Sequence, residues 1–511
     1  MQKMSMRFLA GAVVLGTSAM AFATLPAGLP RLEGLDWRLP AKYAKLEGDV
    51  LTVDIPESDY PQNAVAVAKL SPEQWKGGKD FALCVTVTGE NVKESTERYL
   101  GLKCQIRWDN SDLDIRRFPN AKWNPGSFTN RTFYTSANFD GIEADALEIQ
   151  LGLQGTSGKA VFDLSSLRGG PAERPWTSKN ADKQIAYPDS VAKDVRRRGV
   201  MLSSETPSEK DFATLKEWGA NLVRFQMVRG WNKINDNQDV AEYMRWVDGR
   251  LDDLERVVIP LARKYGQKVV VDLHVPPGGR AFSGGMNMFD DKVFAGAFVD
   301  CWKRIAARFK GNGDVIYGYD LINEPDQPTP VRVDYLQLQE LAAKAIRKID
   351  PDTPIIVEAN NAASPGDFSY LSPIDLDNVI YQVHMYEPHE FTHQGVKGPR
   401  ISVRYPDFDR GLDRQMIVKK MAPVVEFAKK HNAKIYVGEF SAIAWAEGAG
   451  RYLADCIMFF ESQGWDWTYH AFREWNGWSV EHEGPDAEHL VPSADNIRKR
   501  VLLKAFTLPA N

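Results

Sequence analysis

The chain has 511 residues, with 63 Lys and Arg against 68 Asp and Glu, and 43% of its residues are hydrophobic. This composition is typical of a globular protein and excludes a chain that is disordered throughout. The formal charge of -5 provides no basic surface for nucleic acid, and the chain lacks the repeated long apolar runs of a multi-span membrane protein.

The first 23 residues have the pattern of a secretory signal peptide. Lys3 and Arg7 precede a short run of apolar and small residues, and Ala21-Phe22-Ala23 fits the small-residue cleavage pattern. The run is shorter than a membrane span requires, although an uncleaved anchor is the alternative. The sequence therefore predicts a mature chain that begins at Thr24 and is secreted or periplasmic, with no membrane attachment after cleavage.

Residues 24–171 are predicted to form a β-sandwich of jelly-roll type. Short runs alternate apolar and polar residues, with Gly, Asn, Asp and Pro between them, as half-buried strands do. The runs are 49–55, 81–87, 100–108, 146–153 and 160–164. Trp108 and Trp123 are candidates for a surface that stacks on sugar rings, but a place in the core or at an interface is the more common use of Trp and is favoured.

The four cysteines do not form a recognisable disulfide or zinc pattern. Cys84 and Cys104 lie on predicted strands, and an exported chain can form disulfides, so a bond between these two stays open. Cys301 and Cys456 lie in helical patterns and are expected to be buried thiols.

Residues 172–189 are predicted to be a linker, and beyond them the periodicity changes. Over 190–511, strand-like runs alternate with amphipathic stretches of helix length. The eight runs are 199–203, 221–227, 268–275, 315–323, 354–360, 379–386, 434–440 and 465–472. Eight successive βα units predict an α/β fold, a (β/α)8 TIM barrel, and no Gly-rich phosphate loop follows the first run to suggest a dinucleotide-binding sheet.

Polar residues end several of these runs, at the rim where such barrels build their active sites. Two are glutamates, Glu324 after the fourth run and Glu439 in the seventh, so they face each other across the mouth of the barrel. Hydrolysis of a glycosidic bond needs one protonated and one ionised carboxyl group, about 5–5.5 Å apart when the anomeric configuration is retained. The other rim candidates are Arg224, His274, Asn323, His384, Tyr386 and Trp475.

In this chain order, and with Asn323-Glu324-Pro325 after a strand, the rim residues resemble those of glycoside hydrolase family 5 over about residues 190–506. The resemblance implies that Glu324 is the acid/base and Glu439 the nucleophile, and that no metal or other cofactor is required. It implies further that Asn323 binds a sugar hydroxyl and that Arg224 and Tyr386 surround the nucleophile. The remaining substrate-binding candidates are His274, His384 and Trp475.

The resemblance implies a secreted, retaining, endo-acting β-glycanase that hydrolyses β-1,4-glucosidic bonds in cellulose or related β-glucans. The same residues fit β-mannan, xyloglucan or β-1,3-glucan, and the alternative from another class is a non-catalytic carbohydrate-binding protein on a degenerate barrel. The paired glutamates argue against that alternative. The expected partner is a β-linked polysaccharide or oligosaccharide bound by a monomer, while the glycan, endo against exo action and the role of the sandwich stay open.

The two glutamates start from the same ordinary pKa of about 4.3, so their surroundings must separate them. We expect Arg224 to lower the pKa of Glu439, and the resulting negative charge to raise the pKa of Glu324. Taken singly, each residue also has a structural interpretation. Asn323 and Glu324 could cap a helix, and Glu439 could be a buried salt-bridge partner of Arg224 with no catalytic role. His389 and His393 have metal-like spacing, but they lie in a predicted loop, which argues against zinc.

Overall fold

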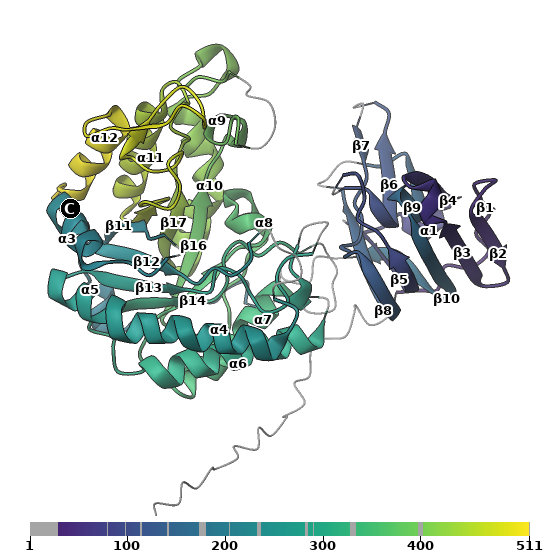
Figure 1. The fold of residues 1–511 in the computed structure, drawn as a ribbon, viewed down its shortest axis with the longest axis horizontal. Helices are drawn as coiled ribbons and strands as arrows, with labels where there is room; N and C mark the ends of the chain where they lie inside the picture. Colours follow the sequence, from purple (N-terminus) through teal and green to yellow (C-terminus); the bar gives the residue numbers. More distant parts are fainter. Residues whose placement is uncertain are drawn as a thin grey trace, which may run out of the picture.

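The computed structural model describes residues 29–509, except 79, 98, 113–114, 140–142, 173–179, 204, 232–236, 282–284, 290, 328–333 and 397–401. The predicted signal peptide and Thr24 lie outside the described residues, as does part of the predicted linker. Within the described ranges, no helix is both long and apolar enough to cross a membrane. Figure 1 shows an N-terminal β-rich region in purple and blue beside a larger α/β region.

The N-terminal region is a sandwich of two antiparallel sheets, as the alternating pattern predicted. One sheet has the order β1 (Trp37–Arg38), β4 (Gln62–Lys69), β9 (Ala146–Thr156), β6 (Gly101–Asn110) and β7 (Ile115–Arg117). The other has the order β2 (Ala44–Glu47), β3 (Val50–Ile55), β10 (Gly158–Ala172), β5 (Asp80–Val92) and β8 (Gly126–Asn138). The inward apolar residues of both sheets pack into one core.

The aromatic residues considered as a sugar platform lie inside this core. Trp108 is 3% exposed and Trp123 is 0% exposed, and the indole N–H of Trp123 donates to the backbone of Leu100. Neither ring can stack on a polysaccharide, which agrees with the favoured interpretation. Cys84 and Cys104 are both buried free thiols.

The second region is a closed barrel of eight parallel strands. In order around the barrel these are β11 (Arg198–Met201), β12 (Leu222–Gln226), β13 (Lys268–Asp272), β14 (Ile316–Asp320), β15 (Ile355–Glu358), β16 (Val379–Met385), β17 (Lys434–Phe440) and β18 (Asp466–Tyr469). β18 pairs with β11 and closes the circle. Nearly every strand residue is buried, because barrel strands pack against helices outside and against each other inside. The predicted TIM barrel is thereby confirmed.

Helices surround the strands, each following its strand in the chain (Figure 1). They are α3 (Glu209–Trp218), α4 (Val240–Asp253), α5 (Ile259–Tyr265), α6 (Lys292–Phe309), α7 (Tyr335–Arg347), α8 (Asn360–Ala363), α10 (Arg414–His431), α11 (Ala449–Gln463) and α12 (Ile497–Phe506). A π-helical turn, Leu254–Val258, joins α4 to α5, where Pro260 has no N–H to give to a regular helix. α8 is a single turn, which agrees with the weak helical pattern in the fifth interval.

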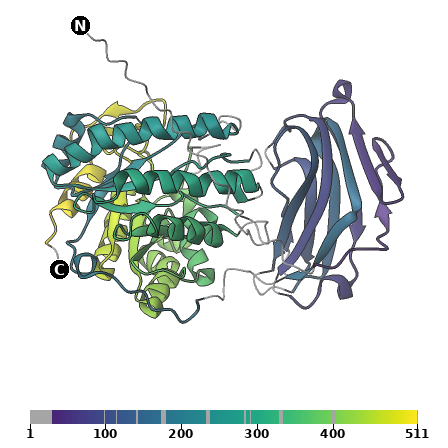
Figure 2. The ribbon, with the colours of Figure 1, turned by 90° about the horizontal axis from the view of Figure 1, so that it is seen from below.

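The sandwich contacts the barrel at the rim formed by the ends of β13 and β14. The side-chain amide of Asn124 donates to Asn287 Oδ1 at 3.1 Å, and Lys122 Nζ lies 3.7 Å from a carboxylate oxygen of Asp326. Figure 2 shows the sandwich beside this end of the barrel. Since Asp326 is two residues beyond Glu324, the sandwich borders the rim that carries the candidate site.

Candidate active site

A cavity of about 810 Å³ opens at the carboxyl ends of the barrel strands. Most of the residues proposed from the sequence line it: His274, Asn323, Glu324, His384, Tyr386 and Glu439. Arg224 lies below its floor, in the middle of β12, and is 0% exposed. The strand ends therefore bring seven of the eight proposed residues together around one cavity.

Arg224 is the centre of the charges beneath this cavity. Its Nη1 donates to Glu439 Oε1 at 2.5 Å, and its Nε donates to Asp320 Oδ2 at 2.9 Å. Its Nη2 reaches Asn323 Oδ1 at 3.0 Å and Glu358 Oε1 at 3.2 Å. The guanidinium thus holds Glu439, the candidate nucleophile, and Asn323, which directly precedes the candidate acid Glu324.

Glu439 ends the barrel strand β17 and is 4% exposed. Besides the contact with Arg224, its Oε2 accepts a hydrogen bond from the Tyr386 hydroxyl at 2.9 Å. Burial raises the pKa of Glu439, but the neighbouring histidines and the Arg224 guanidinium outweigh burial and hold this pKa well below its ordinary value. Glu439 is therefore ionised over the whole working range of pH, as a nucleophile requires.

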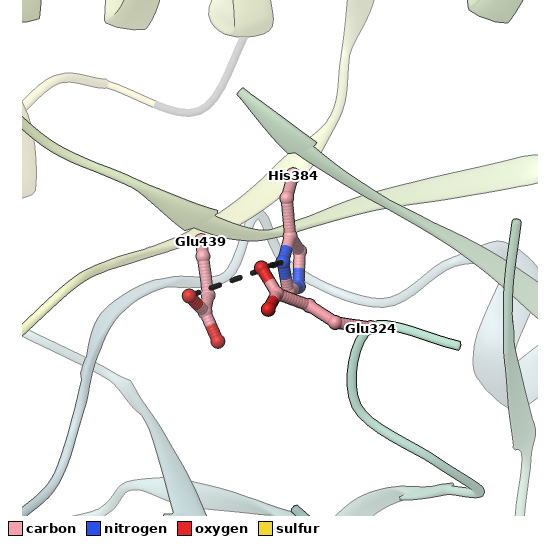
Figure 3. A group of neighbouring side chains, drawn as sticks. All are labelled: Glu324, His384 and Glu439. Carbon is pink, nitrogen blue, oxygen red and sulfur yellow. Dashed lines mark hydrogen bonds and ion pairs between the residues drawn. The ribbon is translucent and has the colours of Figure 1, made fainter. Parts of the chain in front are cut away.

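Glu324 follows β14, and three contacts fix its backbone and side chain. Its N–H donates to Glu358 Oε2 at 2.7 Å, its carbonyl accepts from Arg280 Nη2 at 3.1 Å, and its φ angle is +50°. Its carboxyl oxygen lies 3.1 Å from His384 Nδ1 (Figure 3). A positive φ is costly for Glu, so these contacts hold a conformation that the residue alone would avoid.

The pKa of Glu324 differs from the expectation. Burial raises the pKa of Glu324 most strongly, and the charge of Glu439 raises it further, as expected. The hydrogen bond from His384 and the positive charges of His384 and Arg280 together outweigh both and bring this pKa below its ordinary value. The imidazole was not considered in the prediction from the sequence, because the contact joins two strands 60 residues apart. The proton that the acid role requires therefore depends on His384.

Glu324, His384 and Glu439 also form the one group among the described residues whose ligand-type atoms would suit a metal ion, all within 4.8 Å of one another. One oxygen of Glu439 already pairs with the Arg224 guanidinium, so a metal cation would be placed beside a fixed positive charge. This arrangement favours proton transfer over metal binding. It also puts the two carboxyl groups near the separation of about 5–5.5 Å that retaining hydrolysis uses.

A second hydrogen-bonded chain orients the histidine on β13. His274 Nδ1 lies 2.7 Å from Asp272 Oδ2, and its Nε2 lies 3.1 Å from the side-chain nitrogen of Asn323. Asn323 must donate there, because its oxygen accepts from Arg224, so His274 accepts at Nε2 and donates from Nδ1 to Asp272. The sequence placed both His274 and Asn323 at the rim, and their mutual contact follows from adjacent strands.

Trp475 lies away from the cavity, in contrast to its predicted place beside the substrate. It is 37% exposed, and its ring contacts those of Trp445 and Trp478. β18 ends at Tyr469, so the chain is already in a loop when it reaches Trp475. In the structure the ring of Trp478 lines the cavity instead.

A polar group on the β12 and β18 side of the cavity was not predicted from the sequence. Glu474 Oε2 accepts from Gln226 Nε2 at 3.0 Å and lies 3.4 Å from His470 Nε2. Burial raises the pKa of Glu474, but His470 and the Gln226 amide outweigh burial and lower this pKa. Glu474 is therefore, like Glu439, an ionised carboxylate that lines the cavity. His470 directly follows β18, so strand-end position was a usable signal for it, whereas Glu474 lies in a loop.

A (β/α)8 barrel with two glutamates facing each other at the ends of β14 and β17 defines a glycoside hydrolase. The family model described as "Cellulase (glycosyl hydrolase family 5)" matches residues 189–476. The chain belongs to glycoside hydrolase family 5, as its rim residues suggested.

Two named relatives are an endoglucanase and a cellodextrinase. Endoglucanase C of Acetivibrio thermocellus is 30% identical over 268 residues, which is 47% of this chain and 76% of the relative. Cellodextrinase A of Ruminococcus flavefaciens is 28% identical over 249 residues, 46% of this chain and 68% of the relative. Among solved structures, Thermotoga maritima Cel5A in complex with cellobiose is 24% identical with a TM-score of 0.49, covering 62% of this chain and all of that one.

Proposed function

We propose that this chain is a retaining endo-β-1,4-glucanase, with Glu439 as nucleophile and Glu324 as acid/base. The observation that carries the proposal is the pair itself: two carboxyl oxygens within 4.8 Å, one of them held ionised by Arg224 and Tyr386. A degenerate, purely binding barrel would have no need to keep this costly buried charge pair intact.

The geometry supports a double displacement. Glu439 attacks the anomeric carbon while Glu324 donates a proton to the leaving glycosidic oxygen, which gives a covalent glycosyl-enzyme. Glu324, now ionised, then removes a proton from water as the water displaces Glu439, and the free sugar leaves with its original configuration. Tyr386 and Arg224 stabilise the Glu439 carboxylate each time that it is released.

Endo action on a long glucan is supported by the shape of the cleft. A second cavity of about 720 Å³ adjoins the first and shares Ser364, Pro365 and Glu387 with it. Ser364 and Pro365 follow β15 and Glu387 follows β16, so the second cavity extends the cleft along that part of the rim. Trp231 and Trp478 line the first cavity and offer faces for sugar rings, and the names of the endoglucanase and cellodextrinase relatives agree with a β-1,4-glucan.

A substrate panel tests this assignment. We expect the highest kcat/KM on soluble β-1,4-glucan, with lower values on β-mannan, xyloglucan and β-1,3-glucan in a reducing-sugar assay. Proton NMR of the first product should show the β-anomer, because two inversions at one carbon restore its configuration. An α-anomer released from a β-linked glucan would contradict the mechanism, and preference for another glycan would contradict only the substrate.

Glu474 is proposed to bind a sugar hydroxyl through its free carboxylate oxygen. Since a hydrogen bond to a charged group contributes about 1.5–3 kcal/mol, Glu474→Gln should raise KM for a cello-oligosaccharide by roughly tenfold or more, with a smaller change in kcat. The matched control is Glu481→Gln, which removes a carboxylate that pairs with Arg473 and does not line the cavity. Unchanged KM in the Glu474 variant would contradict substrate contact.

Export is part of the proposal and is supported by the leader of residues 1–23. A glucan polymer is found outside the cytoplasm, so an enzyme that acts on it must be secreted or periplasmic.

The sandwich is proposed to support the rim through Asn124 and Lys122, since its Trp108 and Trp123 are buried.

A further inference from the structure

The barrel interior holds more acids than its one arginine can neutralise. Asp272, Asp320 and Glu358 are each 0% exposed, and all three approach the Arg224 guanidinium within 3.3 Å, in addition to Glu439. Four carboxylates around one buried cation would leave a large uncompensated charge in a medium of low polarity. Some of these acids must therefore carry a proton.

Glu358 is the acid of this group best suited to be neutral. Its contact with Arg224, at 3.2 Å, is longer than that of Asp320 or Glu439, whereas Asp272, at 3.3 Å from Arg224, also contacts His274 Nδ1 at 2.7 Å. Burial and the nearby Asp320 raise the pKa of Glu358 well above its ordinary value, more than Arg224 lowers it. Burial also raises the pKa of Asp320, to about 6. A neutral Glu358 has one O–H to donate and needs an acceptor.

The only neutral side chain beside that oxygen, within the described part of the chain, is Gln382. The Gln382 amide lies between Glu358 Oε1 and His384 Nε2, 3.1 Å from the latter. As placed, its nitrogen faces both groups, while its oxygen is buried without a partner among the described residues. The two ends of an amide have the same shape, so the carbonyl oxygen can take the place of the nitrogen.

That exchange gives the Glu358 O–H and the His384 Nε2–H an acceptor, while the Gln382 nitrogen takes the place of the oxygen that has no partner among the described residues. Glu358 then donates its O–H to the Gln382 oxygen, while Arg224 and the Glu324 N–H still donate to the Glu358 carboxyl. His384 donates its Nε2–H to the same Gln382 oxygen. The lone pair of His384 Nδ1 is left facing Glu324 at 3.1 Å. Gly438 makes room for this amide, because a Cβ there would overlap it.

We propose that Glu358 and Gln382 are positioning residues that hold His384 in the tautomer protonated at Nε2, so that His384 Nδ1 accepts a hydrogen bond from a protonated Glu324. The proposal rests on the acid/base role of Glu324 in the proposed function. In the opposite tautomer Nδ1–H would donate to the Glu324 carboxylate, which is the contact that lowers the pKa of Glu324, and it would stabilise the form that cannot protonate a leaving group. The arrangement also helps the second step, because a carboxylate facing a lone pair binds the proton from water more strongly.

The other charged groups near His384 are consistent with this state. Glu358 Oε1 lies 3.7 Å from His384 Nε2, and Glu439 Oε2 lies 3.9 Å from His384 Nδ1. Arg280 lies beside the backbone of Glu324 and contributes a positive charge that lowers the pKa of its carboxyl group. None of these groups supplies the acceptor for His384 Nε2, so Gln382 carries that role.

Nitrogen NMR of the full chain labelled with 15N-histidine tests the tautomer. The sequence has eight His, and the resonances of His384 are assigned from the spectrum of His384→Gln. We expect the neutral form of His384 in the parent protein to carry its proton on Nε2. Glu358→Gln should keep this tautomer, because the introduced side-chain amide can donate in place of the lost O–H. Gln382→Leu should move the proton to Nδ1 or average the two.

The pH profile provides the second readout. In Gln382→Leu the basic limb of kcat/KM should move down by about one pH unit or more, because Glu324 loses its proton more easily. Gln339→Leu is the matched control, since Gln339 bonds the backbone of Glu358 at 3.0 Å and not its carboxyl group. A merely structural effect would lower activity in both variants without moving the limb.

Two results would overturn the proposal: a proton on His384 Nδ1 in the parent, or a basic limb and tautomer that stay unchanged in a folded Gln382→Leu. Should that variant fail to fold, the spectra of the parent and of Glu358→Gln decide. The tautomer is read without turnover, so a parent that hydrolyses no β-glucan but shows the Nε2–H form would contradict the proposed substrate and not this inference.

Discussion

Replacement of Glu439 by Gln is expected to lower kcat/KM by roughly 10⁴-fold or more, because a glutamine cannot form the covalent intermediate. The amide keeps the size of the side chain, and its oxygen can still accept from Arg224 while its nitrogen can donate to the Tyr386 hydroxyl oxygen. The loss should therefore fall on the chemical step, and cello-oligosaccharide should still bind. Discontinuous assays with an aryl β-cellobioside and with soluble glucan measure kcat/KM on each substrate.

Chemical rescue distinguishes a lost nucleophile from a damaged site. In Glu439→Ala a small anion such as azide can occupy the place of the carboxylate and attack from the same face, which gives an α-glycosyl azide. The control is Glu461→Gln, which removes another Glu–Arg pair, to Arg198 at 2.7 Å, away from the cavity. More than about one part in a hundred of the parent activity in Glu439→Gln would contradict the assignment.

The sequence was sufficient for the frame of the site because a barrel ties position to periodicity. Each strand of this fold is a short apolar run, and the residue that interrupts or follows it lies at the rim. Glu439, His384 and Asn323 stand out because titratable or amide side chains occupy positions where Val or Ile would fill a strand. The two carboxyl groups were therefore placed across one cavity without any knowledge of distances.

The polar residues of the barrel interior were harder to predict. Glu358 lies within the fifth run and Gln382 within the sixth, so each is an isolated break in an apolar strand of the sequence. Their meaning depends on contacts with Arg224, His384 and the Glu324 backbone, which join β12, β15, β16 and the segment after β14. The pKa of Glu324 was predicted in the wrong direction for this reason, since the prediction included the charge of Glu439 and omitted the imidazole.

Loops limited the prediction in a different way. Glu474 and Trp475 are neighbours in one loop, yet only Glu474 lines the cavity. No periodicity governs an irregular loop, so sequence order could not tell which of the two side chains faces inward. In the sandwich, the strands β4 and β8 were not among the predicted runs. The sequence of β4 is rich in Ala and that of β8 is rich in polar residues, so neither shows a strong apolar alternation.

The leaving group should decide how much activity Glu324→Gln retains. On soluble glucan the first step needs a proton on the glycosidic oxygen, and the loss of a positioned acid typically costs about 10²–10⁴-fold. A dinitrophenyl cellobioside leaves without protonation, so its first step should stay close to that of the parent. The second step still lacks its base, because Gln cannot take a proton from water.

The expected time course of dinitrophenol release is therefore a rapid burst of one equivalent per active site, followed by slow turnover. Azide needs no base and should accelerate the slow phase, with the β-glycosyl azide as product. The pH profile should also lose its basic limb, since Glu324 is the group whose deprotonation ends activity in the parent. Glu324 contacts His384 at 3.1 Å, and Glu439 adds a negative charge within 4.8 Å. The pKa of Glu439 stays well below its ordinary value. The basic limb therefore reports the loss of the proton from Glu324 and not the titration of Glu439. Equal losses on glucan and on the activated glycoside, with no burst and an unchanged basic limb, would show that Glu324 is not the acid/base.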